Sequence, residues 1–330
     1  MGTRFIASAV EVNFMSLINI QHVSKRYRST QALNDFSLEI PRGSTYGLIG
    51  PNGAGKTTLM RILAALIAPS SGQVWFENDE VSHTPRVIQR KVGYMPDFFG
   101  VYPDLTCGEY LEFYAGIHGI PHRKRTGIIN DLLELVDLST KRGELVEALS
   151  RGMKQRLCLA RALIHDPEVL ILDEPASGLD PRGRVELREL VRTLRSIGKT
   201  IIISSHILFE LAEMCTHVAI VQDGQLIAAG DVEDVVQQVE GKRQLDIHIL
   251  EQERLDEAIT LLKTIPTISN VTFDGKKGIA ADFTGDEQAL HHILADLMSH
   301  NIPVVSFAPR TGGSRLEEVF MNITEGSGQQ

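Results

Sequence analysis

The sequence is poor in cysteine, has no long apolar run and carries no excess of basic residues. Its three cysteines, Cys107, Cys158 and Cys215, lie far apart without metal-binding spacing, which predicts free thiols of a reducing compartment. No stretch reaches the roughly 18–20 apolar residues that cross a bilayer, so the chain is expected to be soluble by itself. Basic residues number 33 against 42 acidic ones, and the net charge of −9 argues against nucleic acid as the main partner.

The length of 330 residues predicts two domains. We interpret residues 1–14 as a flexible N-terminal extension and residues 324–330 as a disordered tail. The composition turns polar around residues 240–243, which favours a boundary between a first domain over residues 15–238 and a second over residues 239–323. In the second domain the pattern predicts a β-α-β-β-α-β order, which resembles a small ferredoxin-like α+β fold. Its expected strands are 245–250, 271–273, 279–283 and 304–308, with helices 253–263, 287–300 and 315–322.

The first domain alternates short apolar strands with amphipathic helices, which indicates an α/β fold around a buried parallel sheet. Its strands include the fully apolar runs 169–172 and 200–203. Residues 97–165 are mostly helical, and apolar residues at three- and four-residue spacing predict helices over 107–117, 125–136 and 152–165. We therefore expect a mixed core sheet with a helical subdomain inserted at about residues 97–165.

A glycine-rich loop follows an apolar strand that ends at Ile49 and leads directly into a helix. The loop fits the phosphate-binding pattern G-x-x-x-x-G-K-[ST]. Its glycines allow the backbone N–H groups to turn toward phosphate oxygens, and the helix N-terminus adds a positive dipole end. Lys56 would contact the β- and γ-phosphates, and the Thr57 hydroxyl is a candidate Mg²⁺ ligand. The expected nucleotide-binding residues are Gly50, Pro51, Asn52, Gly53, Ala54, Gly55, Lys56, Thr57 and Thr58.

Two acidic residues stand at the end of the apolar strand 169–172. The carboxyl ends of parallel strands are where ligands of such sheets collect. Asp173 is therefore expected to help hold Mg²⁺, and Glu174 to orient and deprotonate an attacking water. A strand that ends in Asp-Glu is weak evidence by itself, and it gains weight from the phosphate loop that precedes it.

A second candidate anion site precedes this strand, in Leu149-Ser-Arg-Gly-Met-Lys-Gln-Arg156. Ser150 and Gly152 would open a helix whose N–H groups face an anion. Taken alone, the segment is more typical of an ordinary serine-capped helix. Together with the phosphate loop, it resembles the signature sequence of ATP-binding cassette (ABC) proteins. Three further matches follow the order of that family: Ser177-Gly-Leu-Asp180 resembles its D-loop, His206 its switch histidine and Tyr27 its adenine-stacking aromatic.

The resemblance covers about residues 16–235 and implies a P-loop NTPase of ABC type. It implies that ATP and Mg²⁺ bind, and that Lys56, Glu174 and His206 act in hydrolysis. It also implies a head-to-tail pair with a second copy or a related subunit, in which Ser150, Gly152 and Asp180 close over the partner's nucleotide. The compact helical region disfavours chromosome-maintenance ATPases, and the single cassette disfavours tandem-cassette translation factors. The ending Ser314–Phe320 resembles drug- and polymer-exporter ATPases with a small accessory domain. Such a subunit energises a separate integral-membrane permease from the cytoplasmic face of the membrane.

Two residues depart from the pattern of the family. Asp97 occupies the position of the usual glutamine and is a candidate metal ligand. It brings negative charge toward a polyphosphate, at a cost of about 4 kcal/mol for unit charges ~4 Å apart at an effective dielectric near 20. Asp97 must therefore be metal-paired, protonated or held back until the permease moves it. Arg151, inside the signature, either adds charge near the partner's nucleotide or points outward.

Two other functions stay open on the sequence alone. The chain could be a nucleotide-dependent switch that regulates a soluble complex, which membrane association of the chain would argue against. It could also be a degenerate cassette that pairs with an active one, as Asp97 and Met153 would allow. An ATPase assay of the purified chain separates this last alternative from an active subunit.

Overall fold

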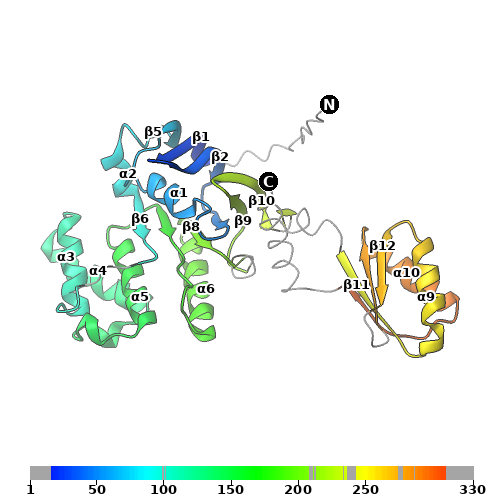
Figure 1. Ribbon diagram of the computed structural model, residues 1–330. Helices are drawn as coiled ribbons and strands as arrows, with labels where there is room; N and C mark the ends of the chain where they lie inside the picture. The colour runs from blue at the N-terminus through cyan, green and yellow to red at the C-terminus, as the bar shows by residue number, and fades with distance from the viewer. Residues whose placement is uncertain are drawn as a thin grey trace. The chain divides into compact units, whose positions relative to one another are not determined.

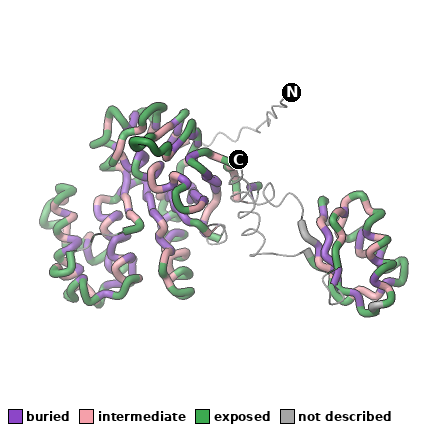
Figure 2. Tube along the Cα trace, viewed as in Figure 1, coloured by how far each residue is buried: buried purple, intermediate pink, exposed green. Residues whose placement is uncertain are grey.

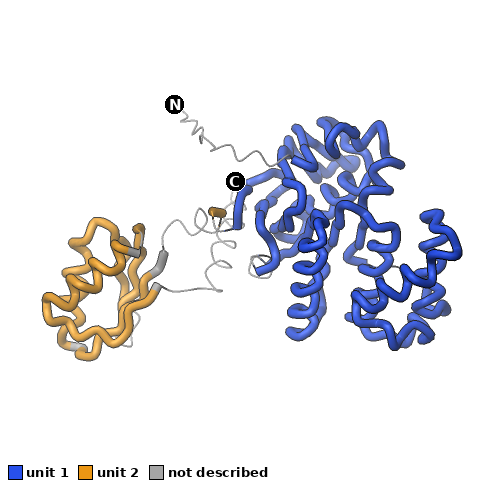
Figure 3. The backbone as a smooth tube through the Cα atoms, turned by 180° about the vertical axis from the view of Figure 1, so that it is seen from behind, with its two compact units in different colours: residues 1–232 blue, residues 233–330 orange. Residues whose placement is uncertain are grey.

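The computed structural model describes residues 16–98, 100, 102–207, 211, 213–232, 234–235, 243–273, 278–285 and 287–309. Its contacts divide the chain into two compact units, residues 1–232 and 233–330 (Figure 3). The sequence had placed this boundary slightly later, between residues 238 and 239. The expected extension 1–14, the expected helix 315–322 and the expected tail 324–330 lie outside the described residues. Among the described residues, no helix combines the length and the apolar character that a membrane crossing requires.

An antiparallel sheet forms the N-terminal part of the first unit. It contains β1 (Ser16–Tyr27), β2 (Thr30–Pro41), β4 (Ser71–Phe76) and β5 (Asp79–Glu80), in the order β2-β1-β4-β5. The apolar side chains that alternate along β1 and β2, among them Ile18, Ile20, Phe36 and Ile40, are buried in the main core cluster of the unit. Period-2 alternation of this kind is the pattern that a half-buried strand requires.

The core sheet places the chain segments that carry the candidate site. Its strands are β3 (Thr45–Ile49), β6 (Val92–Met95), β7 (Val169–Leu172), β8 (Thr200–Ser205), β9 (His217–Gln222) and β10 (Gln225–Asp231), in the order β10-β9-β3-β8-β7-β6. All neighbours pair in parallel except β9 and β10. Every residue of β3, β7 and β8 is buried, as Figure 2 shows. The predicted α/β class with a buried parallel sheet is confirmed.

The helices of the first unit include α1, which follows the phosphate loop, and three helices of the helical subdomain. Figure 1 shows α3, α4 and α5 gathered beside the core sheet. The helix predicted over 107–117 is observed with these bounds, because Thr106 and Glu109 form a reciprocal capping box at its start. The helices are α1 (Lys56–Leu63), α2 (Pro85–Lys91), α3 (Cys107–Ile117), α4 (His122–Leu135), α5 (Arg151–Leu163) and α6 (Pro181–Ser196), with short 3₁₀ turns at Ser139–Lys141 and Val146–Ala148.

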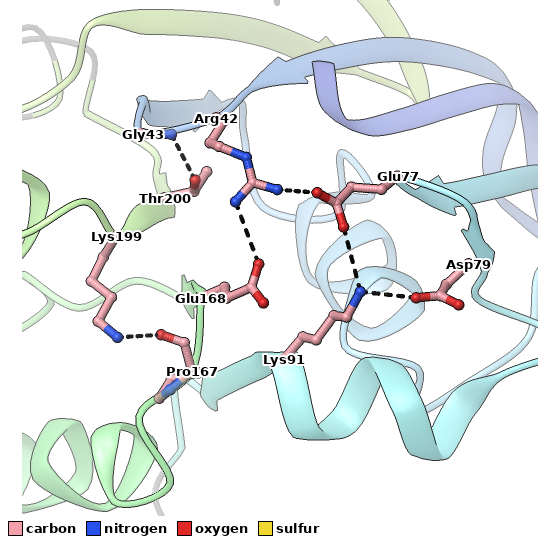
Figure 4. A network of polar contacts seen from close by, with 9 residues as sticks. All are labelled: Arg42, Gly43, Glu77, Asp79, Lys91, Pro167, Glu168, Lys199 and Thr200. Atoms are coloured by element: carbon pink, nitrogen blue, oxygen red, sulfur yellow. Dashed lines mark hydrogen bonds and ion pairs between the residues drawn. The ribbon is translucent and has the colours of Figure 1, made fainter. Parts of the chain in front are cut away.

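A polar network connects the two sheets of the first unit at the amino ends of β7 and β8 (Figure 4). Arg42 pairs with Glu77 and, at 3.5 Å, with Glu168, while Lys91 lies 2.8 Å from Asp79. The backbone N–H of Gly43 donates a 2.8 Å hydrogen bond to the hydroxyl of Thr200. Exposed ion pairs contribute about 0–1 kcal/mol each. The hydrogen bond from the Gly43 backbone to the buried Thr200 therefore contributes more to the alignment of the two sheets than the ion pairs do.

The second unit is a separate antiparallel sheet with two helices. Its elements are β11 (Arg243–Ile249), η3 (Gln252–Arg254), α9 (Leu255–Thr264), β12 (Ile268–Phe273), β13 (Gly278–Phe283), α10 (Glu287–Ser299) and β14 (Val304–Pro309). The strand order is β12-β13-β11-β14, which together with the β-α-β-β-α-β sequence is the arrangement of a ferredoxin-like fold. Its own core includes Leu245, Ile247, Leu262, Phe283 and Leu297.

Two histidine rings stack where the helical subdomain meets the core sheet. His118, which caps α3, lies face to face with His165 at a ring-centroid distance of 4.0 Å. The Nε2–H of His165 donates to the backbone carbonyl of Val92 at 3.1 Å. Burial, followed by the charge of His118, lowers the pKa of His165 to about 4, and burial also lowers the pKa of His118. The fold therefore keeps these rings neutral.

This neutral pair predicts an acid-sensitive stability. The unfolded chain protonates His165 near pH 6.5, and the folded chain near pH 4, so the unfolded state binds more protons between these values. We expect the contribution of His165 to the free energy of unfolding to be largely present above pH 6.5. It should fall between pH 7 and pH 5 by at most about 2 kcal/mol, because the ring is only partly buried. Urea unfolding of His165→Gln should lack this component. The control His122→Gln, which removes an exposed histidine ring, should keep this loss of stability between pH 7 and pH 5. If His165→Gln kept the pH dependence of the unmodified chain, His165 would not be its source.

Candidate functional site

The phosphate loop joins β3 to α1 and takes a conformation that only glycine tolerates at two points. Gly53 and Gly55 have φ values of +85° and +105°, in the region that other residues rarely adopt. A Cβ atom on Gly55 would lie 2.4 Å from the carbonyl oxygen of Ala32, and one on Gly50 would lie 2.2 Å from that of Val221. Gly55 precedes α1 and offers no side-chain cap. The first N–H groups of α1 thus remain available for an anion.

Lys56 is buried, with 6% of its side chain exposed, at the start of α1. Its ammonium donates hydrogen bonds to the carbonyl oxygens of Gly50 at 2.6 Å and Pro51 at 3.1 Å. It also lies 3.6 Å from Oε1 of Glu174. Burial lowers the pKa of Lys56, and the charges of Glu174 and Asp173 oppose that shift. A buried cation whose hydrogen bonds go largely to carbonyl oxygens is suited to exchange them for phosphate oxygens.

Asp173 and Glu174 follow β7 at the carboxyl edge of the core sheet. Asp173 is 1% exposed, and its Oδ1 accepts a 2.7 Å hydrogen bond from the hydroxyl of Ser204 on β8. Glu174 adopts a φ of +48°, and its Oε2 lies 3.0 Å from Nδ1 of His206. The structure thus brings together Lys56, Asp173, Glu174 and His206, which the sequence had selected from three separate segments.

A pocket opens between the phosphate loop and these acidic residues. Its lining consists of Ala32, Asn52, Gly53, Ala54, Gly55, Lys56, Thr57, Thr58, Asp97 and Glu174. Burial raises the pKa of Asp97, and the charges of Asp173 and Glu174 raise it further, against an opposing effect of Arg151. Asp97 therefore faces the acidic side of the pocket, where a proton or a cation would relieve the repulsion among the three carboxylates.

The oxygen donors at this pocket fit a magnesium ion that binds together with a polyphosphate. Among the described residues, no group of three or more His, Cys, Asp or Glu side chains is placed to hold a metal ion. The pocket instead offers the Thr57 hydroxyl and the Asp97 carboxylate, and Asp173 interacts electrostatically with both Lys56 and Asp97. Mg²⁺ usually binds through one or two carboxylates and takes further oxygens from substrate phosphates and water.

Apart from Gly50 and Pro51, which contact Lys56 through their carbonyl oxygens, four further predicted nucleotide-binding residues do not line this pocket. Ser150 caps α5 and accepts the N–H of Met153 at 3.3 Å, while Asp180 caps α6 and accepts the N–H of Gly183 at 2.9 Å. Gly152 belongs to the first turn of α5, and Tyr27 is 42% exposed at the end of β1. The two helix N-termini are preorganised by their caps. Within one chain these residues therefore contribute nothing to the Lys56 pocket.

Arg151 neither projects freely nor enters the pocket. Its side chain is exposed, but the guanidinium lies against Gly178, where an added Cβ atom would come within 2.6 Å of Cζ. Gly178 has a φ of +74°, in the left-handed region that favours glycine. Arg151 thus connects the start of α5 to the loop before α6.

Three residues that the sequence patterns did not single out, Tyr94, Ser204 and Lys25, contact predicted site residues, and the Tyr94 hydroxyl donates to Oδ2 of Asp173 at 3.5 Å. Ser204 bonds to Asp173, and the ammonium of Lys25 lies 5.3 Å from the ring centroid of Tyr27 while it donates to the carbonyl of Ala68 at 2.6 Å. The available signals were modest: a polar Ser-Ser pair that ends an apolar strand next to His206, and a lysine two residues before an aromatic.

Comparisons with known proteins identify relatives of this chain. A family model described as ABC transporter matches residues 33–177. A daunorubicin resistance ATP-binding protein of Streptomyces coeruleorubidus is 32% identical over 93% of this chain and 95% of its own length. A Nod factor export ATP-binding protein of Rhizobium etli is 36% identical over 71% of this chain and 74% of its own. A solved ATP binding subunit of an ABC transporter superposes with a TM-score of 0.61 at 28% identity, over 68% of this chain and 93% of the other.

Proposed function

Because the chain belongs to the ABC transporter family, we propose that the pocket between Lys56 and Glu174 is where it binds and hydrolyses ATP. The chain is an ATP-binding subunit that energises export through a separate membrane permease. One observation supports the pocket above all: a buried lysine and a carboxylate 3.6 Å apart face each other across a glycine loop at the carboxyl edge of a parallel sheet. Such an edge is where ligands of open α/β sheets bind.

The contacts of each residue support a role in hydrolysis. Lys56 would transfer its hydrogen bonds from the carbonyls of Gly50 and Pro51 to the β- and γ-phosphate oxygens. Glu174, freed from Lys56, would accept a proton from water as the water oxygen attacks the γ-phosphorus and the bond to the bridging oxygen of ADP breaks. His206 would hold the Glu174 carboxylate through its 3.0 Å contact. Mg²⁺, when bound through Thr57, Asp173 and Asp97, supplies charge neutralisation of the phosphates.

A second subunit would complete the site. Ser150 and Gly152 carry the N-terminus of α5, and Asp180 that of α6, and none of them lines the pocket of its own chain. A head-to-tail pair would bring the α5 N-terminus of one subunit to the γ-phosphate held by the other, where its dipole and N–H groups stabilise negative charge. The partner can be a second copy or a related subunit. Tyr27, exposed at the end of β1, would stack on adenine.

Exposed aromatic side chains beside Asp97 indicate where the permease would dock. Phe98 is 87% exposed and directly follows Asp97. Tyr102 and Phe113 are about half exposed and meet edge to face, with ring centroids 5.6 Å apart, and Ile117 extends this surface. Apolar groups gathered in this way are typical of protein–protein contacts. Docking here, on the cytoplasmic face of the membrane, would connect movement of the permease to the Asp97 side of the nucleotide pocket.

Asp97 also favours a second reading of the site, in which the chain is a weakened cassette that pairs with an active one. Its carboxylate adds negative charge to a pocket that must accept a polyphosphate. Steady ATP hydrolysis by the purified chain, without a related subunit, would exclude this reading.

The assignment of Glu174 as the base predicts the effect of Glu174→Gln. We expect the turnover of ATP to fall by roughly 10²–10⁴, the range for loss of a general base, because the amide cannot accept the proton of the attacking water. The variant should still bind ATP and should accumulate as an ATP-bound dimer, measurable by light scattering after size exclusion. The matched control is Glu168→Gln, at the other end of β7, which should hydrolyse ATP as the unmodified chain does. Equal rates for both variants would exclude Glu174 as the base.

The proposed docking surface predicts the effect of Phe98→Ala. Burial of a phenylalanine side chain is worth about 1.5–3 kcal/mol, so its loss should weaken association with the permease by about tenfold or more. Co-purification with membranes that contain the permease, compared at equal expression, measures this loss. Phe273→Ala removes a ring that is 47% exposed on the second unit and should leave association unchanged. Undiminished association of Phe98→Ala would place the docking surface elsewhere.

A further inference from the structure

Ser204 lies at the carboxyl end of β8, beside the end of β7. The parallel register pairs Leu172 with Ile203, so the residues that follow, Asp173 and Ser204, emerge next to each other. Ser204 is fully buried, with 0% exposure, and Asp173 is 1% exposed. Solvent therefore has little access to replace any hydrogen bond that connects them.

One hydroxyl makes two hydrogen bonds to adjacent residues of the site. The Ser204 O–H donates to Oδ1 of Asp173 at 2.7 Å, and the same oxygen accepts the backbone N–H of Glu174 at 2.9 Å. A serine hydroxyl has a single hydrogen to donate, and it is given to the carboxylate. The backbone N–H of Asp173 meanwhile donates to the carbonyl of Met95 on β6 at 2.9 Å. The junction between β7 and the acidic pair is thus held from both neighbouring strands.

The bond to Glu174 acts on a strained backbone. Glu174 has a φ of +48°, a region that a residue with a Cβ atom disfavours. In this conformation its carboxylate reaches both Lys56, at 3.6 Å, and His206, at 3.0 Å. The Ser204 oxygen satisfies the N–H of Glu174 in the strained conformation. Loss of that oxygen would free the backbone to relax and the carboxylate to turn away from the pocket.

We propose that Ser204 is a positioning residue for ATP hydrolysis, which holds the carboxylate of Asp173 and the backbone of Glu174 in one fixed relation. This inference rests on the proposed roles of Asp173 at the metal and Glu174 as the base. Ser204 is fully buried and does not line the nucleotide pocket. It acts through the orientation of Asp173 and Glu174, in the way that outer-shell partners orient metal ligands.

The chain offers a matched comparison on the same strand. Thr200, at the opposite end of β8, is 1% exposed and uses its hydroxyl to accept the N–H of Gly43 at 2.8 Å. Figure 4 shows it within the polar network at the amino ends of β7 and β8. Ser204→Ala and Thr200→Val therefore each remove one buried hydroxyl from β8. If Ser204 only supported the fold, both variants should have the same effects on metal binding and turnover.

The experiment uses the full chain and measures metal binding separately from turnover. With ADP bound, the affinity for Mn²⁺ as a spectroscopic substitute for Mg²⁺ should fall about 10–100-fold in Ser204→Ala, as is typical for loss of an outer-shell partner. The affinity for ADP without metal should change by less than about threefold, because the phosphate loop is intact. At saturating ATP, kcat should fall 10–100-fold with little change in KM. Ser204→Thr, which keeps the hydroxyl, should recover most of the metal affinity.

Thr200→Val should bind Mn²⁺ and hydrolyse ATP as the unmodified chain does, even if its unfolding midpoint falls. If Ser204→Ala does not fold, Ser204→Cys provides the same comparison with a weaker donor of similar shape. Unchanged Mn²⁺ affinity and kcat in the Ser204 variant, or equal losses in both variants, would overturn the proposal. If instead the unmodified chain showed no hydrolysis, the proposed function would fail, while the Mn²⁺ measurement would still report on the bond between Ser204 and Asp173.

Discussion

The site depends on the contact between a buried lysine and a largely buried carboxylate at the edge of one parallel sheet. Lys56 and Glu174 come from different crossovers, and their charged atoms lie 3.6 Å apart, with 6% and 15% of the two side chains exposed. Each partner lowers the cost of burying the other. The parallel order β3-β8-β7 places the ends of three strands side by side, and the glycines at 50 and 55 allow the loop to pass close to Val221 and Ala32. The opposite charges of Lys56 and Glu174 thus compensate each other before a nucleotide binds.

Much of this arrangement was predictable because it follows from local patterns. Fully apolar runs indicated β7 and β8, a glycine loop before a helix indicated the phosphate site, and apolar residues at three- and four-residue spacing indicated α3. Ser204 and the position of Arg151 against Gly178 were not predictable. The first depends on the register between β7 and β8, and the second on how α5 packs beside the loop before α6. Neither is encoded by spacing within a single segment.

The two departures from the family pattern acquire a physical context in the structure. Asp97 lines the nucleotide pocket, where burial and two carboxylates raise its pKa, and the exposed Phe98 follows it directly. A proton or metal ion at Asp97 would offset the repulsion that its charge imposes on a polyphosphate. Arg151 is held over Gly178, and its positive charge opposes the rise in the pKa of Asp97. Asp97 thus adjoins Phe98 on the proposed permease surface. Its carboxylate also interacts with Arg151, which stands in the sequence between Ser150 and Gly152, the residues expected at the partner's nucleotide.

The central claim is that Lys56 of one subunit and Ser150 of another act on the same ATP. A mixing experiment tests it most directly: chains with Lys56→Ala and chains with Ser150→Asp are each inactive as pairs of identical copies, but a mixed pair contains one intact site. Equal mixing should restore about a quarter of the unmodified ATPase rate per chain, because half of the pairs are mixed and each has one complete site. If the mixture stayed as inactive as the separate variants while mixed pairs demonstrably formed, the two residues would not share a nucleotide.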